Sequence, residues 1–154
     1  MKTLMLCISI HHENTRKIAN AIAEVLKAEV MNPAEVVKDI DKIKSYDLIG
    51  FGSGIYGFKH HKNLIGFVEK LPQQNGTKAF IFSTSGKGGT DQHKELRKKM
   101  EEKGFAIVGE FGCKGWDSFG PLALVGGVNK GKPDENDLED ARNFAKSMMK
   151  KKRK

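Results

Sequence analysis

Short apolar segments recur along this chain, and segments with helical periodicity separate them. The apolar segments cover residues 3–8, 29–31, 47–52, 78–84 and 105–113. Nearly continuous apolar runs of this length are typical of strands that are covered on both faces of a sheet. Strands that alternate with helices of ~10–15 residues indicate parallel βαβ units. We therefore predict one doubly wound α/β domain.

The segments between these strands present apolar residues on one face. In residues 14–28, the side chains of Ile18, Ile22, Val25 and Leu26 have the i, i+4, i+7, i+8 spacing of an amphipathic helix. The same periodicity predicts helices over residues 61–71, 90–103 and 134–149. Residues 32–46 are polar and contain a proline, so we expect an irregular connection there with one helical turn.

The composition suits one compact domain. The chain has 154 residues, of which 38% are hydrophobic and 30% charged, and we expect residues 1–149 to form a single core. The apolar stretch at residues 4–10 is shorter than the ~18 residues that cross a bilayer and lacks a signal-peptide cleavage site, so no transmembrane segment is expected. Two cysteines, Cys7 and Cys113, make no disulfide framework, which favours a reducing, cytoplasmic setting.

The formal net charge is +8, and five of the positive charges form the tail KKKRK at residues 150–154. Without this tail, basic residues only slightly outnumber acidic ones. We expect the tail to be a solvated helix end, because cations stabilise a helix C-terminus and termini are usually loosely packed. A tether to nucleic acid or to a membrane is the alternative. Specific recognition of nucleic acid is not expected.

Ligands of a doubly wound sheet bind beyond the carboxyl ends of the strands, so the loops that follow the strands are the candidate site. The first loop, SIHHENT at residues 9–15, leads directly into a helix. Free backbone N–H groups and the positive end of the helix dipole favour a phosphate there. The loop is neither a Walker loop nor a Gly-x-Gly-x-x-Gly turn. The alternative is an ordinary helix cap made by Asn14 or Thr15.

The loops after the later strands are rich in glycine. They read GSGIYGF at residues 52–58, STSGKGG at 83–89 and GCKGWDSFG at 112–120. Glycine permits close approach of the backbone to a ligand, and the two aromatic residues around Gly57 suit a flat ligand. Together with the helix start of the first loop, these loops predict a phosphorylated, planar cofactor.

This combination resembles the flavodoxin family over essentially the whole chain. The matching segments are Asn14-Thr15 followed by RKIA, the strand DLIGFGS at residues 47–53, the loop GIY at 54–56 and FSTSG at 82–86. The resemblance implies a five-stranded parallel sheet of order 2-1-3-4-5 with helices on both faces, and FMN as the cofactor. It also implies an electron carrier in which no side chain acts as a catalytic acid or base.

The resemblance further implies which residues hold the FMN. The residues expected around the phosphate are Ser9, His11, His12, Asn14 and Thr15. The residues expected along the flavin are Ser53, Ile55, Tyr56 and Gly57 on one side, and Ser83, Thr84, Ser85 and Gly86 on the other. Tyr56 is the expected stacking residue, and the peptide carbonyl at Gly57 is expected to meet flavin N5.

Three features depart from the family pattern. Glu13 stands where the family commonly has glycine before Asn-Thr, and its carboxylate repels a nearby phosphate unless it points to solvent. Histidines replace the usual hydroxyl-bearing residues of this loop, although they also donate hydrogen bonds to phosphate. Electron-carrier flavodoxins are typically acidic and this chain is basic, so we expect its redox partner proteins to be acidic.

Two further functions are compatible with the same pattern. An FMN-dependent quinone or porphyrinogen oxidoreductase of this fold would use Trp116, Phe119 and residues 114–132 to shape a substrate pocket. Otherwise the two aromatic residues either cover the cofactor or pack the long loop. The third interpretation is a non-redox binding module whose basic tail holds nucleic acid or a membrane.

Two chemical alternatives concern histidine and cysteine. The pairs His11-His12 and His60-His61 suggest a metal site, but they lack the spacing of metal ligands. Cys113 stands at the end of a predicted strand, beside Lys114, and a neighbouring cation favours the reactive thiolate.

Overall fold

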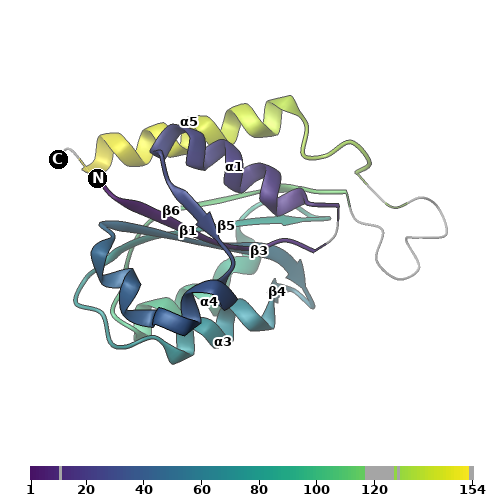
Figure 1. The fold of residues 1–154 in the computed structure, drawn as a ribbon. Helices are drawn as coiled ribbons and strands as arrows, with labels where there is room; N and C mark the ends of the chain where they lie inside the picture. The colour runs from purple at the N-terminus through teal and green to yellow at the C-terminus, as the bar shows by residue number, and fades with distance from the viewer. Residues whose placement is uncertain (11, 117–126, 128, 153–154) are drawn as a thin grey trace.

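The computed structural model describes residues 1–10, 12–116, 127 and 129–152 (Figure 1). The elements in chain order are β1 (Thr3–Ile8), α1 (Asn14–Leu26), β2 (Glu29–Met31), α2 (Pro33–Val36), the 3-10 helix η1 (Val37–Ser45), β3 (Leu48–Tyr56), β4 (Lys59–His60), α3 (Lys62–Lys70), β5 (Lys78–Ser85), the 3-10 turn η2 (Asp91–His93), α4 (Lys94–Glu102), β6 (Ala106–Lys114) and α5 (Glu135–Lys152). Among the described residues, no helix has both the length and the apolar character needed to span a bilayer.

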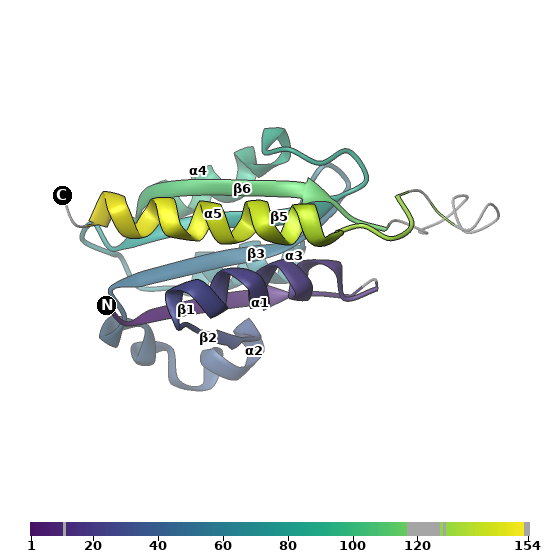
Figure 2. The ribbon, with the colours of Figure 1, turned by 90° about the horizontal axis from the view of Figure 1, so that it is seen from above.

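The sheet is parallel in the order β2-β1-β3-β5-β6, and the two-residue strand β4 pairs antiparallel with β3. With β4 left out of the count, this is the predicted order 2-1-3-4-5, so the prediction of a doubly wound sheet is confirmed. Helices α1 and α5 cover one face, and α3 and α4 cover the other (Figures 1 and 2). The sequence pattern did not predict β4, because two residues are too few to show a strand period.

Each face of the sheet has its own hydrophobic core. Along β1, Leu4, Leu6 and Ile8 pack on the face of α3 and α4, whereas Met5 and Cys7 pack on the face of α1 and α5. Successive side chains of a strand point to opposite faces, so a strand buried on both faces is apolar at every position. This double burial explains why the central strands were visible as continuous apolar runs.

Two segments differ from the sequence prediction. Residues 33–45 are helical rather than mostly irregular, and Asn32 begins this region with a capping box in which it pairs with Glu35. Strand β3 continues to Tyr56 rather than ending at residue 52, because β4 extends the pairing through Ile55 and His60. Residues 53–56 are therefore held in the sheet and are not part of a free loop.

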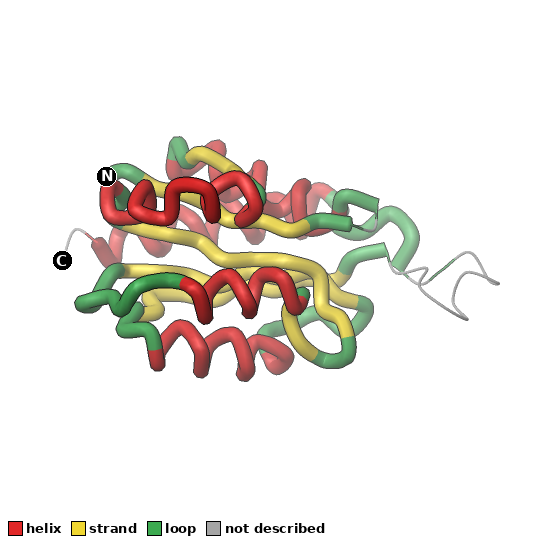
Figure 3. The backbone as a smooth tube through the Cα atoms, turned by 60° about the horizontal axis from the view of Figure 1, so that its bottom comes forward, coloured by secondary structure: helices red, strands yellow, loops and turns green. Residues whose placement is uncertain are grey.

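The parallel arrangement brings the loops after β1, β3, β5 and β6 to the same end of the sheet (Figure 3). Residues 9–10, 12–15, 57–58 and 86–90 therefore lie at one end of the molecule although they are far apart in the sequence. This end of the sheet holds the candidate site.

Candidate functional site

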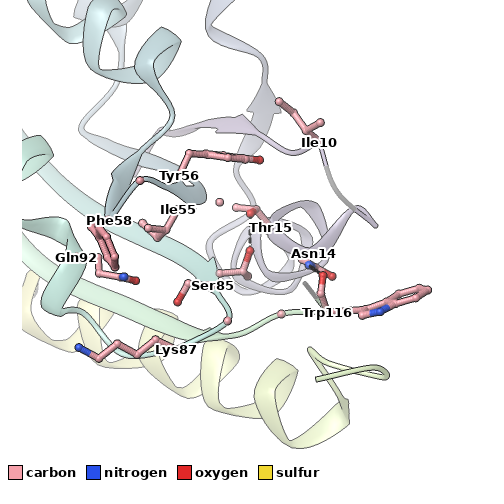
Figure 4. A pocket seen from close by; sticks show the side chains of 15 residues that line it. Ile10, Asn14, Thr15, Ile55, Tyr56, Phe58, Ser85, Lys87, Gln92 and Trp116 are labelled. Carbon is pink, nitrogen blue, oxygen red and sulfur yellow. Dashed lines mark hydrogen bonds between the residues drawn. The ribbon is translucent and has the colours of Figure 1, made fainter. Parts of the chain in front are cut away.

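A cavity of about 460 Å³ opens at the carboxyl ends of the strands (Figure 4). This volume lies within the ~300–1,000 Å³ range that is usual for small-molecule sites. The predicted site residues that line it are Asn14, Thr15, Ile55, Tyr56, Gly57, Thr84, Ser85 and Gly86. Phe58, expected beside a flat ligand, and Trp116, expected either over the pocket or in the packing of the long loop, also line it. The lining residues that were not among those predicted to contact a ligand are Ile10, Gly54, Lys87, Gln92 and Gly115.

The start of α1 forms one wall of the cavity. Thr15 Oγ1 and Thr84 Oγ1 lie 2.7 Å apart in a buried hydrogen bond that ties α1 to β5. The Asn14 Nδ2 group donates to the backbone oxygen of Trp116 over 2.8 Å and ties α1 to the end of β6. These two contacts hold the first turn of α1 against β5 and the end of β6, with the N-terminal end of the helix directed at the cavity.

Two oxygen atoms of the cavity lining lack partners. Asn14 Oδ1 and Gln92 Oε1 are buried and accept no hydrogen bond from the described residues. A buried polar atom without a partner costs roughly 1–3 kcal/mol. The two side chains approach the cavity from α1 and from η2, on different sides (Figure 4). A ligand with N–H or O–H donors would satisfy both.

The backbone before α1 adopts the left-handed conformation at two positions. His12 has φ of 53° and Glu13 has φ of 56°, values that favour glycine. The Glu13 carbonyl accepts the first hydrogen bond of the helix from Lys17 N over 3.1 Å. The backbone at Glu13 therefore needs a positive φ to enter the helix, and the Glu13 side chain is exposed.

Trp116 lines one end of the cavity, and its side chain packs on His12 of the first loop. Its ring stacks on His12, with centroids 3.6 Å apart and planes inclined by 11°, and Lys130 Nζ lies 5.6 Å from the ring centroid. Its backbone N–H donates to Lys132 O. In Figure 4 the indole lies beside Asn14, far from the Tyr56 side. His11 and Phe119 lie outside the described residues.

A tight hairpin forms the opposite wall. Tyr56 pairs with Lys59 across β3 and β4, which leaves Gly57 and Phe58 as a two-residue turn. Both have positive φ, 59° and 67°, as a type I′ turn requires. Phe58 is 84% exposed although it lines the cavity. The hairpin thus presents two aromatic rings, at positions 56 and 58, beside the cavity (Figure 4).

Four of the predicted residues do not line this cavity. Ser53 is fully buried, donates to Gly54 O over 2.6 Å and accepts from His61 N over 2.9 Å. Ser83 is buried against η2 rather than in the cavity. Both serines face α3 and α4, whereas Thr84 faces α1, because neighbouring strand residues alternate. The two others, Ser9 and His12, lie in the first loop, where Ser9 Oγ accepts from Arg16 N over 3.1 Å.

Ser83 belongs to a buried polar chain beneath the site. Its Oγ lies 2.7 Å from His93 Nε2, and His93 Nδ1 lies 3.0 Å from Glu110 Oε1. Arg97 binds both oxygens of Glu110, over 2.8 and 2.9 Å. Burial lowers the pKa of His93, and Glu110 opposes that shift. The order Ser-His-Glu is that of a hydrolase triad, but Ser83 is 1% exposed and lies outside the cavity, so a substrate cannot reach it.

The cysteine and metal alternatives find no support in the described part of the chain. Cys113 is buried, and this burial raises the pKa of its thiol to about 12. The thiolate that Lys114 was expected to favour is therefore disfavoured at neutral pH. Within the described ranges, His, Cys, Asp and Glu form no group of three that could hold a metal ion.

Comparison with known proteins agrees with this geometry. The flavodoxin domain model matches residues 5–115. An uncharacterized protein of Methanocaldococcus jannaschii is 52% identical over 152 residues, which cover 97% of this chain and 99% of that protein.

Solved flavodoxin structures share the fold over nearly the full length. A flavodoxin from Archaea matches with a TM-score of 0.71 and 21% identity, and covers 98% of both chains. Flavodoxin 2 of Bacillus cereus matches with a TM-score of 0.68 and 21% identity, covering 98% of this chain and 99% of that one. A Fusobacterium nucleatum flavodoxin bound to flavin mononucleotide matches with a TM-score of 0.66 and 14% identity, with coverage of 98% and 99%. From the family model, the sheet order and these likenesses together, the chain belongs to the flavodoxin domain family.

Proposed function

We propose that this protein binds FMN in the cavity of about 460 Å³ and carries electrons between partner proteins. The observation that supports this most directly is the pair of partnerless oxygens, Asn14 Oδ1 and Gln92 Oε1, in a cavity that also holds the start of α1. FMN carries donors for these two oxygens in its flavin N–H and its ribityl hydroxyls, and its phosphate suits the backbone N–H groups of a helix N-terminus. The Fusobacterium relative was solved with FMN.

The lining residues fit the two halves of this cofactor. The backbone N–H groups at the start of α1, beside Asn14 and Thr15, would hold the phosphate. The hairpin with Ile55 and Tyr56 and the loop after Thr84 would hold the flavin, which supplies one- or two-electron transfer when bound. The protein itself contributes orientation, shielding from water and local charge.

The small number of titratable side chains among the described lining residues favours a carrier over an enzyme. Among the described residues that line the cavity, Tyr56 and Lys87 are the titratable ones. Lys87 is 65% exposed and paired with Asp91. An oxidoreductase that delivers protons to an organic substrate needs a positioned donor. An electron carrier needs only the flavin and an accessible edge.

We also propose that its redox partners are acidic proteins that dock over the cavity mouth. Phe58, which is 84% exposed, supplies an apolar contact there. Lys114 and Lys130 are exposed beside the same end of the sheet, and neither forms an ion pair within the described residues. Aromatic and cationic residues around a redox site favour an acidic, partly apolar partner surface.

An absorbance titration of the purified chain with FMN, followed by stepwise reduction with dithionite, tests the proposed function. The flavin spectrum should shift on binding and bleach reversibly on reduction. Tyr56→Ala should weaken FMN binding roughly tenfold through lost stacking, worth about 0.5–1.5 kcal/mol beyond buried area. Tyr46→Phe is the matched control, because Tyr46 is buried beside Glu29, away from the cavity. Absence of FMN binding, or equal loss in both variants, contradicts the proposal.

A further inference from the structure

A second cavity, of about 500 Å³, lies between the end of β1, α2 and α3. Ile10 lines both cavities. Tyr56 of the first cavity contacts His61 of the second edge to ring, with centroids 5.3 Å apart. The two cavities are therefore neighbours, and the second is as large as the first.

Exposed apolar side chains face this second cavity. Ile10 is 55% exposed and Val37 is 44% exposed, and both line it. Four large hydrophobic side chains are exposed in the described part of the chain, so half of them gather here. Exposed apolar residues that cluster around a concave surface mark binding sites. At Gly66 a Cβ would meet nothing within 4 Å, so the α3 wall is open.

The charge of the lining is entirely positive. Lys62 and Lys70 line the second cavity, and no Asp or Glu does. Neither lysine has an ion-pair partner within the described ranges, unlike Lys87 of the first cavity, which pairs with Asp91. Uncompensated cations beside apolar surface favour an anion with an apolar body.

His61 adds a neutral hydrogen-bond donor. Its Nδ1 accepts from Asn63 N over 3.0 Å at the start of α3, so the proton of the neutral ring resides on Nε2. Burial and the neighbouring Lys62 lower the pKa of His61, which keeps the ring neutral at physiological pH. The cavity thus offers two cations, one N–H donor and an apolar floor.

We propose that the second cavity binds a small organic anion, an apolar ring or chain that bears one acidic group. The volume of about 500 Å³ suits a small molecule rather than a protein segment. The apolar body lies on Ile10, Val37 and the open wall at Gly66, and the acidic group pairs with Lys62 and Lys70. Binding at the second cavity does not require FMN in the first cavity, although the two cavities are neighbours.

Calorimetric titration of the full chain, saturated with FMN where FMN binds, tests this site. The probe is naphthalene-2-sulfonate, and the control ligand is its neutral isostere naphthalene-2-sulfonamide. We expect one binding site for the sulfonate and at least tenfold weaker binding of the sulfonamide. Equal affinities, no binding of the sulfonate, or displacement of the sulfonate by FMN would overturn the proposal, the last because the probe would then occupy the first cavity.

Substitutions locate the probe. Gly66→Leu places a side chain in the open space and should reduce sulfonate affinity at least tenfold, while the helical position tolerates leucine. Lys62→Gln combined with Lys70→Gln should remove the preference for the sulfonate over the sulfonamide. Lys98→Gln is the matched control, because Lys98 is an exposed α4 lysine with no ion pair in the described chain. Unchanged sulfonate binding in Gly66→Leu excludes this cavity.

The same variants separate this site from the proposed function. Gly66→Leu and the double lysine variant should bind FMN as the unsubstituted chain does, because none of these residues lines the first cavity. A chain that binds the sulfonate but not FMN refutes the proposed function and leaves the second site standing. If the chain binds FMN but not the sulfonate, the second site is refuted and the proposed function stands.

Discussion

Acid should destabilise this protein through His60, and the structure sets the size of the effect. His60 is 1% exposed in β4. Its Nε2 lies 3.1 Å from the carbonyl oxygen of Phe82, and its Nδ1 is buried without a partner in the described residues. Burial, and then the neighbouring His93, lower the pKa of His60 from 6.5 to about 3. The folded protein therefore keeps this ring neutral at pH values at which the unfolded chain protonates it.

The sign of the pH dependence follows from this difference. Because the folded pKa is the lower one, the contribution to stability is complete above pH ~6.5 and is lost as the pH falls toward ~3. Between about pH 8 and about pH 5 the unfolded chain gains nearly one proton that the folded protein does not, which costs about 2 kcal/mol. The slope near pH 5.5 is about 1.2 kcal/mol per pH unit. His61 and His93, whose pKa values are also lowered by burial, add to this loss.

Urea unfolding of the unsubstituted chain and of His60→Gln, at a series of pH values, measures the effect. The glutamine amide can still donate to the Phe82 carbonyl, so the variant preserves the hydrogen bond but not the titration. The unsubstituted chain should lose about 2 kcal/mol more than the variant between about pH 8 and about pH 5. Parallel stability curves for the two proteins would refute the claim that His60 is neutral and buried in the folded state.

Three further predictions address the loop before α1, the end of β3 and the tail. Glu13→Gly should raise the melting temperature, because release of the left-handed strain, ~1–2 kcal/mol, exceeds the entropy cost of glycine, ~0.5–1 kcal/mol; a lower melting temperature contradicts this. Ser53→Ala should lower the free energy of unfolding in urea by roughly 1–3 kcal/mol, because the partly buried His61 N–H loses its acceptor; a neutral result would show that water replaces it. A chain that ends at Met149 should keep its melting temperature and its FMN affinity in fluorescence titration, and a large loss of either would show that the tail packs on the domain.

The architecture was predictable because burial on both faces leaves a clear trace in the sequence. Each central strand of a parallel sheet is apolar at every position, and each covering helix shows a one-sided pattern. The helix start at Asn14 and Thr15 was visible for a related reason. Polar residues that separate a buried strand from an amphipathic helix must lie at the carboxyl end of the sheet.

The division of residues between the cavity and the core was harder to predict. Ser53 and Ser83 were assigned to the flavin because small polar residues after a strand look like loop residues. The structure keeps both serines in strands, where successive side chains point to opposite faces of the sheet. Neighbouring residues indicate which face each position takes. Phe80 and Phe82 cover Gly50 and Gly52 on the face of the sheet that α1 covers. Continuing that alternation places Thr84 on the α1 face and Ser83 on the opposite one.

Other features depend on contacts between distant segments. Gln92 reaches the cavity because residues 91–93 form a 3-10 turn ahead of α4, and no local pattern distinguishes that turn from the helix. The pairing of Glu110 with His93 and with Arg97 joins β6, η2 and α4. Local sequence patterns report local periodicity, so interactions of this kind emerge only once the strand order is known.

The central claim, that the cavity seats FMN with its phosphate at the start of α1, is tested most directly by comparing FMN with riboflavin. Quenching of flavin fluorescence on titration with the purified chain gives both affinities under identical conditions. FMN should bind at least ~10-fold more tightly, because each charge-assisted hydrogen bond to the phosphate contributes about 1.5–3 kcal/mol. Equal affinities for FMN and riboflavin, or no quenching of either, would contradict the account.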